Sequence, residues 1–433
     1  MKRKLTQQLI SWKEQSTRKP LLLDGARQVG KTYLLEECFG KKYFENVHKF
    51  DFRENPNLEK IFSDGLNAEK ILKSLELELG KKIDLKSDLI FFDEIGECQA
   101  AVDSLKYFCE QKPTLYLCSS GSNIGLLNSF PVGKVQTMEL FPMTFYEFLS
   151  ASKEELLIEE FENRSRLMPT HEKLWDKLTD YYFVGGMPEA VASWFNTENI
   201  SDKIKKVDQI HKDLLNGYKR DFGKYGGKVN SLHIETVFEQ IPRQLHKFQD
   251  DSVKRFLFKD IISGKSRYTE LRGPIDWLEK SKLLSKNYVI QSRPVAPLRN
   301  LIKDNLFKLF FFDLGLLCHS LKLSYQEVKN QDFAAKGFIA ENFVQNELIA
   351  SGHEFSFSWT EAKSEIEFIM QTKSGDIYPL EVKSGKRTKA QSLRTYIQKY
   401  KPVIDVKLIG SRGSEDDKSY RWPLYYTKYL NDL

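Results

Sequence analysis

The fold is decided by the stretch LLLDGARQVGKT, residues 21–32. Its last eight residues fit the pattern GxxxxGK[ST]. The apolar run before them predicts a strand, and the periodicity from Lys31 to Phe39 predicts a helix. A glycine-containing turn between a strand and a helix offers backbone N–H groups to phosphates. The stretch therefore predicts a nucleotide site, with a chance glycine-rich turn as the alternative.

The loop residues indicate ATP with Mg²⁺ as the ligand. Lys31 supplies a positive charge to the outer phosphates in binding and catalysis, and the Thr32 hydroxyl is a ligand for Mg²⁺. The glycines allow the backbone to curl tightly around the phosphates. We expect the nucleotide to contact Gly25, Ala26, Arg27, Gln28, Val29, Gly30, Lys31 and Thr32.

A second apolar run ends in two carboxylates. Asp88 to Phe92 predicts a strand that is buried on both faces, and Asp93 and Glu94 follow it directly. Ligands of open parallel sheets bind at the carboxyl ends of the strands. We expect Asp93 to organise the Mg²⁺ ligands and Glu94 to orient or deprotonate the attacking water.

Polar residues also follow the next predicted strand, Thr114 to Cys118. They read Ser119-Ser120-Gly121-Ser122-Asn123. Their side chains either contact the γ-phosphate or the attacking water, or only hydrogen-bond within a loop or helix cap. Both interpretations stay open.

Length and composition indicate a globular chain of several domains. The chain has 433 residues, of which 41% are hydrophobic and 29% charged, with a net charge of +6. This length predicts about two to four domains, and the mild charge alone does not indicate nucleic-acid binding. Five cysteines without a CxxC pair indicate a reducing compartment, so we expect a cytoplasmic protein. Residues 1–15 predict an amphipathic helix rather than a signal peptide, and no run is long enough to span a membrane.

The order of elements predicts an α/β protein of four domains. Strands that alternate with helices at the N-terminus indicate a parallel sheet, and the helical pattern from Phe145 to about Ser201 indicates a lid. A helical pair at Tyr268 to Leu284, then strands at Asn287 to Gln291 and Phe307 to Phe312, indicate a winged helix. A helix at Gly337 to Ala350 precedes three further strands. The expected domains are a P-loop ATPase core (1–150), a helical lid (151–205), a helical or winged-helix domain (206–325) and a C-terminal α/β domain (326–433).

Several motifs resemble a known family when read in order. They are GARQVGKT (25–32), FFDEI (91–95), SSGSN (119–123), LFPMTFYEFL (140–149) and GGMPEAV (185–191). This order resembles the bacterial and archaeal AAA-type ATPases that carry a C-terminal domain of unknown function. Later segments are similar to further landmarks of that family, namely RDFGKYG (220–226), WLEKSKLL (277–284), KLFFFDLGLL (308–317) and LEVKSG (380–385).

The resemblance implies an additional-strand P-loop ATPase with a helical lid. Asp93 and Glu94 would form its Walker B pair, and Ser120 would be the sensor. Gly185 to Pro188 is similar to a lid motif that approaches adenine, so Pro188 is a candidate nucleotide contact; a plain helix breaker is the alternative.

The chain departs from this family at two positions. Gly96 stands where the family often has glutamine, and Lys134 stands where it has arginine. If that arginine is a finger in relatives, lysine keeps the charge but loses the planar fork, and slow turnover is expected. Arg220 is the alternative finger, acting in trans in an oligomer, unless it only forms an exposed salt bridge.

The C-terminal part resembles the PD-(D/E)xK nuclease core. Glu341, Glu367, Glu381 and Lys383 are its candidate catalytic residues, with Glu367 and Glu381 as metal ligands. Alternation along a strand places Glu381 and Lys383 on one face. Carboxylates and a lysine that converge there would bind Mg²⁺ and position a water for attack on a phosphodiester. Glu367 stands where the usual residue is aspartate.

Two basic segments are candidates for contact with nucleic acid. Residues 383–401 carry seven Lys or Arg and no acidic residue, with Tyr396 and Tyr400 interleaved. A solvated helix face that only confers solubility is the alternative. The predicted winged helix either binds DNA or packs against the ATPase. Its basic residues are Arg267, Arg272, Lys280, Lys282 and Lys286.

The sequence supports three hypotheses about function. The first is an ATP-dependent switch that acts on or near DNA or RNA through the nuclease-like domain. The second is a signalling or assembly ATPase whose C-terminal domain binds a protein partner and cleaves nothing. The third is an ATP-binding scaffold with negligible hydrolysis. An oligomer is compatible with each, and none requires a membrane.

Overall fold

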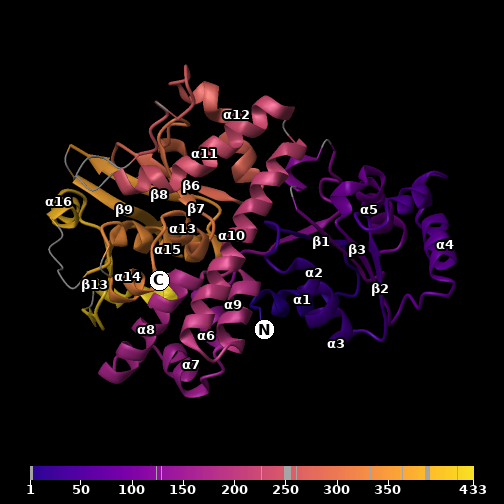
Figure 1. Cartoon of the computed structure of the whole chain (residues 1–433), viewed down its shortest axis with the longest axis horizontal. Coiled ribbons are helices and arrows are strands. Elements are labelled where there is room, and N and C mark those ends of the chain that lie inside the picture. Colours follow the sequence, from indigo (N-terminus) through magenta and orange to yellow (C-terminus); the bar gives the residue numbers. More distant parts are fainter. Residues whose placement is uncertain are drawn as a thin grey trace. The chain divides into compact units, whose positions relative to one another are not determined.

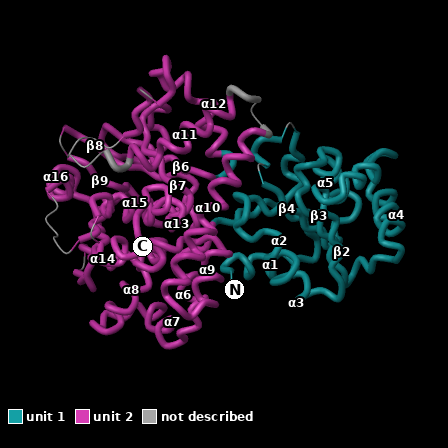
Figure 2. Tube along the Cα trace, in the orientation of Figure 1, with its two compact units in different colours: residues 1–141, 280–282 teal, residues 142–279, 283–433 magenta. Residues whose placement is uncertain are grey.

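The chain folds into two compact units, each with its own sheet. The computed structural model describes residues 3–122, 124–127, 129–225, 227–247, 255–259, 261–331, 333–362, 364–385, 391–416 and 418–433. The first unit comprises residues 1–141 and 280–282, and the second comprises residues 142–279 and 283–433 (Figure 2). The ranges predicted as lid, winged-helix and nuclease-like domains therefore lie in the second unit, except for residues 280–282.

The first unit alternates strands and helices. Its helices are α1 (Leu5–Lys13), α2 (Lys31–Tyr33), α3 (Lys41–Tyr43), α4 (Ala68–Leu79) and α5 (Gln99–Gln111), and α2 continues into α3 through a π-helical segment, Leu34–Gly40. Its strands are β1 (Leu21–Asp24), β2 (Val47–Asp51), β3 (Leu89–Asp93), β4 (Leu117–Gly121) and β5 (Gln136–Glu139).

The five strands form a parallel sheet in the order β2-β3-β4-β1-β5 within the described residues. Strand β4 lies between β1, which leads into the P-loop, and β3, which carries the acidic pair. Strand β4 is therefore the additional strand that the resemblance implies between the P-loop strand and the strand with the acidic pair. In Figure 1, α1 to α3 and α4 to α5 flank this sheet on opposite sides. Strand β5 was not predicted, because three of its four residues are polar and it pairs with β1 at the edge.

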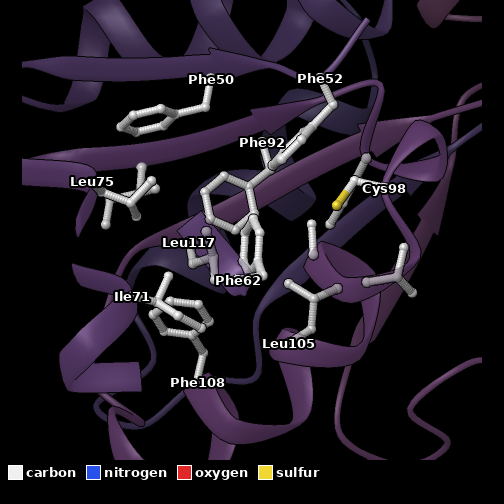
Figure 3. Close-up of a cluster of buried hydrophobic side chains, with 14 of the residues drawn as sticks. Phe50, Phe52, Phe62, Ile71, Leu75, Phe92, Cys98, Leu105, Phe108 and Leu117 are labelled. Carbon is white, nitrogen blue, oxygen red and sulfur yellow. The ribbon is translucent and has the colours of Figure 1, made fainter. Parts of the chain in front are cut away.

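Phenylalanine rings fill the core between the sheet and helices α4 and α5 (Figure 3). The ring of Phe92 on β3 makes edge-on contacts with Phe50, Phe52, Phe62 and Phe108, with centroids 5.5–6.3 Å apart. Successive side chains of a strand face opposite sides of the sheet. Because Phe92 faces α4 and α5, Asp93 faces the opposite side, where the helix after the P-loop begins.

The second unit combines helices with a larger sheet. Its helices are α6 (Phe145–Ala151), α7 (Glu155–Glu162), α8 (Met168–Val184), α9 (Pro188–Asn196), α10 (Ile200–Tyr225), α11 (Gly227–Lys247), α12 (Tyr268–Lys280), α13 (Leu314–Ser320), α14 (Tyr325–Asn330), α15 (Lys336–Ala350) and α16 (Gln391–Tyr400). Its strands are β6 (Leu284–Ile290), β7 (Phe307–Phe311), β8 (Ser356–Glu361), β9 (Ser364–Gln371), β10 (Ile377–Lys383), β11 (Asp405–Ile409), β12 (Ser414–Glu415) and β13 (Ser419–Pro423).

The two strands predicted for the winged helix belong to the larger sheet of the second unit. The sheet order in the described residues is β12-β13-β11-β10-β9-β8-β6-β7, so the hairpin β6–β7 continues the C-terminal sheet, and β6 pairs in parallel with β8. Every residue of β7 is buried, as expected for a strand covered on both faces rather than for an exposed wing. The helical pair predicted at Tyr268 to Leu284 is one helix, α12, which includes Pro274.

The helices predicted as a lid pack on α15 and on the last residues of the chain. The backbone N–H of Phe145 donates to the Glu347 carboxylate at 2.8 Å. The Tyr429 hydroxyl donates to the Phe161 carbonyl oxygen at 3.0 Å. His171 Nδ1 and the Tyr425 hydroxyl lie 2.8 Å apart. These bonds join α6 to α8 to the rest of the second unit.

Two further findings concern membrane-spanning helices and disulfide bonds. Among the described residues, none of the helices is both long and apolar enough to cross a membrane. None of the five cysteines, all of which lie in the described ranges, forms a disulfide.

Candidate functional site

The P-loop leaves β1 at a point where a side chain would not fit. A Cβ added to Gly25 would lie 2.3 Å from the carbonyl oxygen of Leu140, which is a backbone atom. Gly30, the last residue before α2, has a φ of 92°, in the left-handed region that favours glycine. The two glycines of the motif are thus required by a close approach and by a backbone angle. Arg3 also supports the loop, donating to the Val29 carbonyl oxygen at 3.1 Å.

Lys31 lies at the start of α2 with its ammonium group over the loop. Its Nζ donates to the carbonyl oxygens of Gly25 at 2.9 Å and Ala26 at 2.8 Å. Burial lowers the pKa of Lys31 to about 8, while the charges of Glu94, Asp24 and Asp93 oppose that shift. Most molecules therefore carry a protonated Lys31 near neutral pH, next to the positive end of a helix.

Asp93 is the centre of a hydrogen-bond network at the carboxyl ends of three neighbouring strands. The Thr32 hydroxyl lies 3.1 Å and 3.0 Å from its two oxygens. The Ser120 hydroxyl, at the end of β4, also donates to Asp93. Ser120 is completely buried, so this hydrogen bond gives its side chain a structural partner. Its predicted role as a sensor stays a prediction.

Glu94 has an unusual backbone for its residue type. Its φ of 50° and ψ of 43° place it in the left-handed region, which costs a non-glycine residue free energy. This bend follows Asp93, the last residue of β3. Ser122 Oγ lies 3.4 Å from its Oε2, so Ser122 is the hydroxyl beside the predicted base. Asn123, the last residue of that motif, lies outside the described residues.

These residues fit a magnesium nucleotide. A hydroxyl and a carboxylate, the oxygen ligands that Mg²⁺ uses beside phosphates, meet at Thr32 and Asp93. The N-terminus of the α2 helical segment and the Lys31 ammonium supply positive charge for the phosphates. The loop residues predicted to contact the nucleotide thus lie in one continuous turn beside the predicted metal ligands.

Lys49 is a charged member of this site that sequence reasoning missed. It lies on β2, and its Nζ is 3.1 Å from Asp93 Oδ2. Its Nζ is also 3.5 Å from Asp51 Oδ2 and 3.8 Å from Glu36 Oε2. The parallel register of β2 and β3, which pairs Asp51 with Asp93, brings these groups together. The one local signal was the polar alternation of Lys49 and Asp51 at the end of a strand.

The positions of Lys134, Arg220 and Pro188 do not test their predicted roles. Lys134, where the resembling family has arginine, forms an ion pair with Glu110 at 2.8 Å. Arg220 is exposed on α10 in the second unit, and its role as an arginine finger stays a prediction. Pro188 begins α9 in the second unit, and its contact with adenine also stays a prediction.

The glycine pair before Pro188 is held by Asp313, within the motif KLFFFDLGLL. The N–H of Gly186 donates to Asp313 Oδ2 at 2.7 Å, and Met143 donates to the Gly186 carbonyl oxygen at 2.7 Å. Asp313 also caps α13 by accepting from Leu316 at 3.0 Å. Burial raises the pKa of Asp313 to about 6. Two motifs of the resembling family therefore contact each other inside the second unit.

The nuclease-like residues form a buried charge cluster in the second unit. Lys383 Nζ lies 3.1 Å from Glu367 and 2.7 Å from Glu381. Lys308 on β7, which was not predicted, lies 3.4 Å from Glu341 and 2.5 Å from Glu365. Glu341, Glu367 and Glu381 are 3%, 7% and 2% exposed. The predicted residues are thus close together, but each of the three glutamates already pairs with a lysine.

No set of three His, Cys, Asp or Glu residues in the described ranges is placed to hold a metal ion. Glu367 and Glu381 share the Lys383 ammonium, and the backbone N–H of Val382 donates to Glu367 at 3.3 Å. A metal site built on Glu367 and Glu381 alone stays a prediction.

Replacing Glu367 by Gln is expected to change the pH dependence of stability. Burial and the charge of Glu381 raise the pKa of Glu367 to about 8, so the folded state holds this proton more tightly than the unfolded chain does. The stabilisation is complete below the unfolded pKa of about 4.3 and is lost as the pH rises through about 8. The free energy of unfolding, measured with denaturant, should therefore fall less from pH 6 to 9 in Glu367→Gln than in wild type.

An exposed glutamate provides the matched control for this prediction. Glu354 lies on the surface before β8, and Glu354→Gln should keep the wild-type pH dependence. A wild-type fall in stability that persists in Glu367→Gln would contradict the assignment of the proton to Glu367.

Some residues of the two basic segments are not available for contact with nucleic acid. Tyr396 is 2% exposed and packs edge-on against Trp359, so it belongs to the core and does not offer its face to a base. Residues 386–390, the most basic part of the predicted run, lie outside the described residues. In the predicted winged helix, Lys286 is buried and pairs with Asp276 at 3.0 Å and Glu279 at 2.6 Å. Arg272 pairs with Asp276 as well.

A cavity of about 650 Å³ in the second unit had no sequence signal. It lies along α10, α11 and α13, with Lys212, Lys219 and Arg243 in its lining. His211 also lines it, and burial lowers the pKa of His211 to about 4, so this imidazole is neutral at pH 7. Lys219 already pairs with Glu239. The lining thus mixes both charges.

Comparison with known families matches three parts of the chain. Residues 17–149 match an AAA domain family. Residues 176–327 match a domain of unknown function (DUF8612), and residues 336–427 match a second domain of unknown function (DUF4143). The first match includes the P-loop, Asp93 and Glu94. The chain therefore contains an AAA-type P-loop domain, as predicted.

Comparisons with whole proteins add little. No curated protein matches the chain. Among solved structures, it is similar to a signal transduction ATPase with numerous domains from Pyrococcus horikoshii, which has a tetratricopeptide-repeat sensor. The sequence identity is 14%, the TM-score is 0.27, and the match covers 81% of this chain and 45% of that chain. The chain thus spans less than half the length of that protein.

Proposed function

We propose that this protein is a Mg²⁺-dependent ATPase that works as a nucleotide-driven switch. The observation that carries the proposal is the contact of Thr32 with Asp93, directly beside the loop that Lys31 covers. A chance glycine-rich turn would not place a hydroxyl, a carboxylate and a buried ammonium group at the same edge of a parallel sheet. The AAA domain match over residues 17–149 supports the same activity.

Each residue has a defined task in this proposal. Lys31 and the loop amides hold the β- and γ-phosphates, and bound Mg²⁺ supplies charge neutralisation at the phosphate oxygens. Thr32 and Asp93 hold the metal. Glu94 orients the attacking water and accepts its proton, and Ser122 fixes the carboxylate of Glu94 through the contact at 3.4 Å. Arg220 in an oligomer is the candidate for a finger that speeds an otherwise slow turnover.

In this proposal the second unit makes the contact that the nucleotide controls. One candidate output is contact with DNA or RNA, through the C-terminal basic segment. The other is contact with a protein partner, as in a signalling or assembly ATPase. The ion pairs of Lys286 and Arg272 and the burial of Tyr396 reduce the free basic and aromatic surface, and they favour the protein partner.

Metal-dependent cleavage of nucleic acid is a second candidate function. The approach of Lys383 to Glu367 and Glu381, with Glu341 close enough to raise the pKa of Glu367, favours it. The ion pairs and the burial of the cluster oppose it. A metal would have to displace Lys383 from Glu367 and Glu381, and Lys308 from Glu341. Incubation of the full chain with DNA and RNA in Mg²⁺ or Mn²⁺ tests this function. Cutting that disappears in Lys383→Ala would support it, and intact substrates beside an active ATPase would exclude it.

The ATPase rate with DNA, with RNA and without polymer tests the proposed switch. Hydrolysis of ATP is expected in all three conditions. A rate that one polymer raises severalfold identifies the output as nucleic acid, whereas equal rates favour the protein partner. Absence of Mg²⁺-dependent hydrolysis in every condition leaves only the ATP-binding scaffold.

A further inference from the structure

One lysine stands among the acidic groups beside the predicted metal ligands. Lys49 Nζ is 3.1 Å from Asp93, 3.5 Å from Asp51 and 3.8 Å from Glu36. The side chain is 28% exposed, so water partly screens these pairs and the ammonium can move. A single cation therefore has three carboxylates within reach.

The same Asp93 carboxylate is the predicted ligand of Mg²⁺. It already accepts hydrogen bonds from Thr32 and Ser120, and its Oδ2 is the atom nearest to Lys49. Two cations at one carboxylate repel each other, and the repulsion doubles when one of them is divalent. Mg²⁺ and Lys49 must then compete for Asp93.

We propose that Lys49 is a counter-ion switch that sets the Mg²⁺ requirement of the nucleotide site. Before the metal binds, Lys49 pairs with Asp93 and neutralises it. When Mg²⁺ arrives with the nucleotide, Lys49 turns to Asp51 and Glu36, which are near enough to receive it by side-chain rotation alone. The inference rests on the proposed function, because it needs a magnesium nucleotide at this site.

Replacement of Lys49 by Met tests the competition. Binding of a fluorescent ATP analogue to the full chain is measured at increasing Mg²⁺ concentrations. A separate titration with the analogue, in EDTA and without added Mg²⁺, measures binding in the absence of the metal. The Mg²⁺ concentration for half-maximal binding should fall about fivefold in Lys49→Met, on the scale of a partly exposed ion pair. Binding in EDTA should change much less. An unchanged Mg²⁺ requirement would overturn the inference.

Lys42→Met is the matched control for this variant. Lys42 is exposed on α3 of the same unit and pairs with none of the described acidic residues, so its removal changes the net charge equally without touching Asp93. It should bind the analogue with the wild-type Mg²⁺ requirement. Equal effects of Lys42→Met and Lys49→Met would reduce the result to net charge and overturn the switch.

Glu36→Gln tests the second position of Lys49. Without this acceptor, Lys49 leaves Asp93 less readily, so the Mg²⁺ requirement should rise in the wild-type background. In Lys49→Met the same change should have a much smaller effect, because the moving cation is absent. An equal effect in both backgrounds contradicts the transfer. If the wild-type protein itself binds no nucleotide with Mg²⁺, the proposed function fails, and the inference fails with it.

Discussion

ATP turnover should fall about a hundredfold or more in Glu94→Gln, while ATP binding stays near the wild-type level. Gln keeps the size of the side chain and can still contact Ser122, but it cannot accept a proton from water. Lys31, which contacts the phosphates, and Thr32, which holds the metal, are unchanged, so binding of the nucleotide should survive. Phosphate release measures the turnover, and a fluorescent ATP analogue measures the binding.

A neighbouring glutamate controls for the loss of charge. Glu97 is exposed at the end of the turn that follows Glu94, and Glu97→Gln makes the same chemical change three residues away. It should leave turnover within about twofold of wild type, because an exposed side chain of this kind contributes little. Turnover in Glu94→Gln that matches the wild type would remove Glu94 from the role of base.

The second unit should lose about 3 kcal/mol of stability in Gly186→Ala. A Cβ at Gly186 would lie 2.2 Å from the carbonyl oxygen of Met143 and 2.7 Å from its nitrogen, and both are backbone atoms. These atoms cannot move apart without breaking the hydrogen bond from Met143 to the Gly186 carbonyl oxygen. The strain should extend to Asp313, which accepts from the Gly186 N–H.

Gly217→Ala should instead increase the stability of the second unit. Gly217 lies on the exposed face of α10, with no atom within 4 Å of an added Cβ, so Ala should stabilise the helix by about 0.5–1 kcal/mol. Denaturant unfolding followed by tryptophan fluorescence measures both variants in the second unit, since it holds Trp175, Trp194, Trp277, Trp359 and Trp422. Equal stability of Gly186→Ala and wild type would contradict the close approach of Gly186 to Met143.

The nucleotide site was predictable where its signal is local. The P-loop and the pair Asp93 and Glu94 follow apolar strands directly in the chain, and the parallel sheet places the ends of these strands at one edge. The bend at Glu94 and the pairing of Lys49 with Asp93 were not predictable. The pairing depends on the register between β2 and β3, which joins segments about forty residues apart and leaves no local pattern.

The domain organisation was harder to predict because strand pairing is not local. The hairpin β6–β7 has the local pattern of a wing, but β6 pairs with β8, whose residues come about seventy positions later. In this sheet Lys308 of β7 pairs with Glu341 and Glu365. These ion pairs also could not be predicted from the local sequence. By contrast, Glu381 and Lys383 lie two residues apart on one strand, and their shared face was predictable.

Binding of ATP to the purified full chain, with and without Mg²⁺, tests the central claim most directly. A labelled analogue should bind to the wild type in the presence of Mg²⁺, bind more weakly in EDTA, and bind at least about tenfold more weakly to Lys31→Ala, which lacks the ammonium group that faces the phosphates. Wild-type protein that takes up no nucleotide with Mg²⁺ present, or a Lys31→Ala variant that binds as tightly as the wild type, would contradict the account.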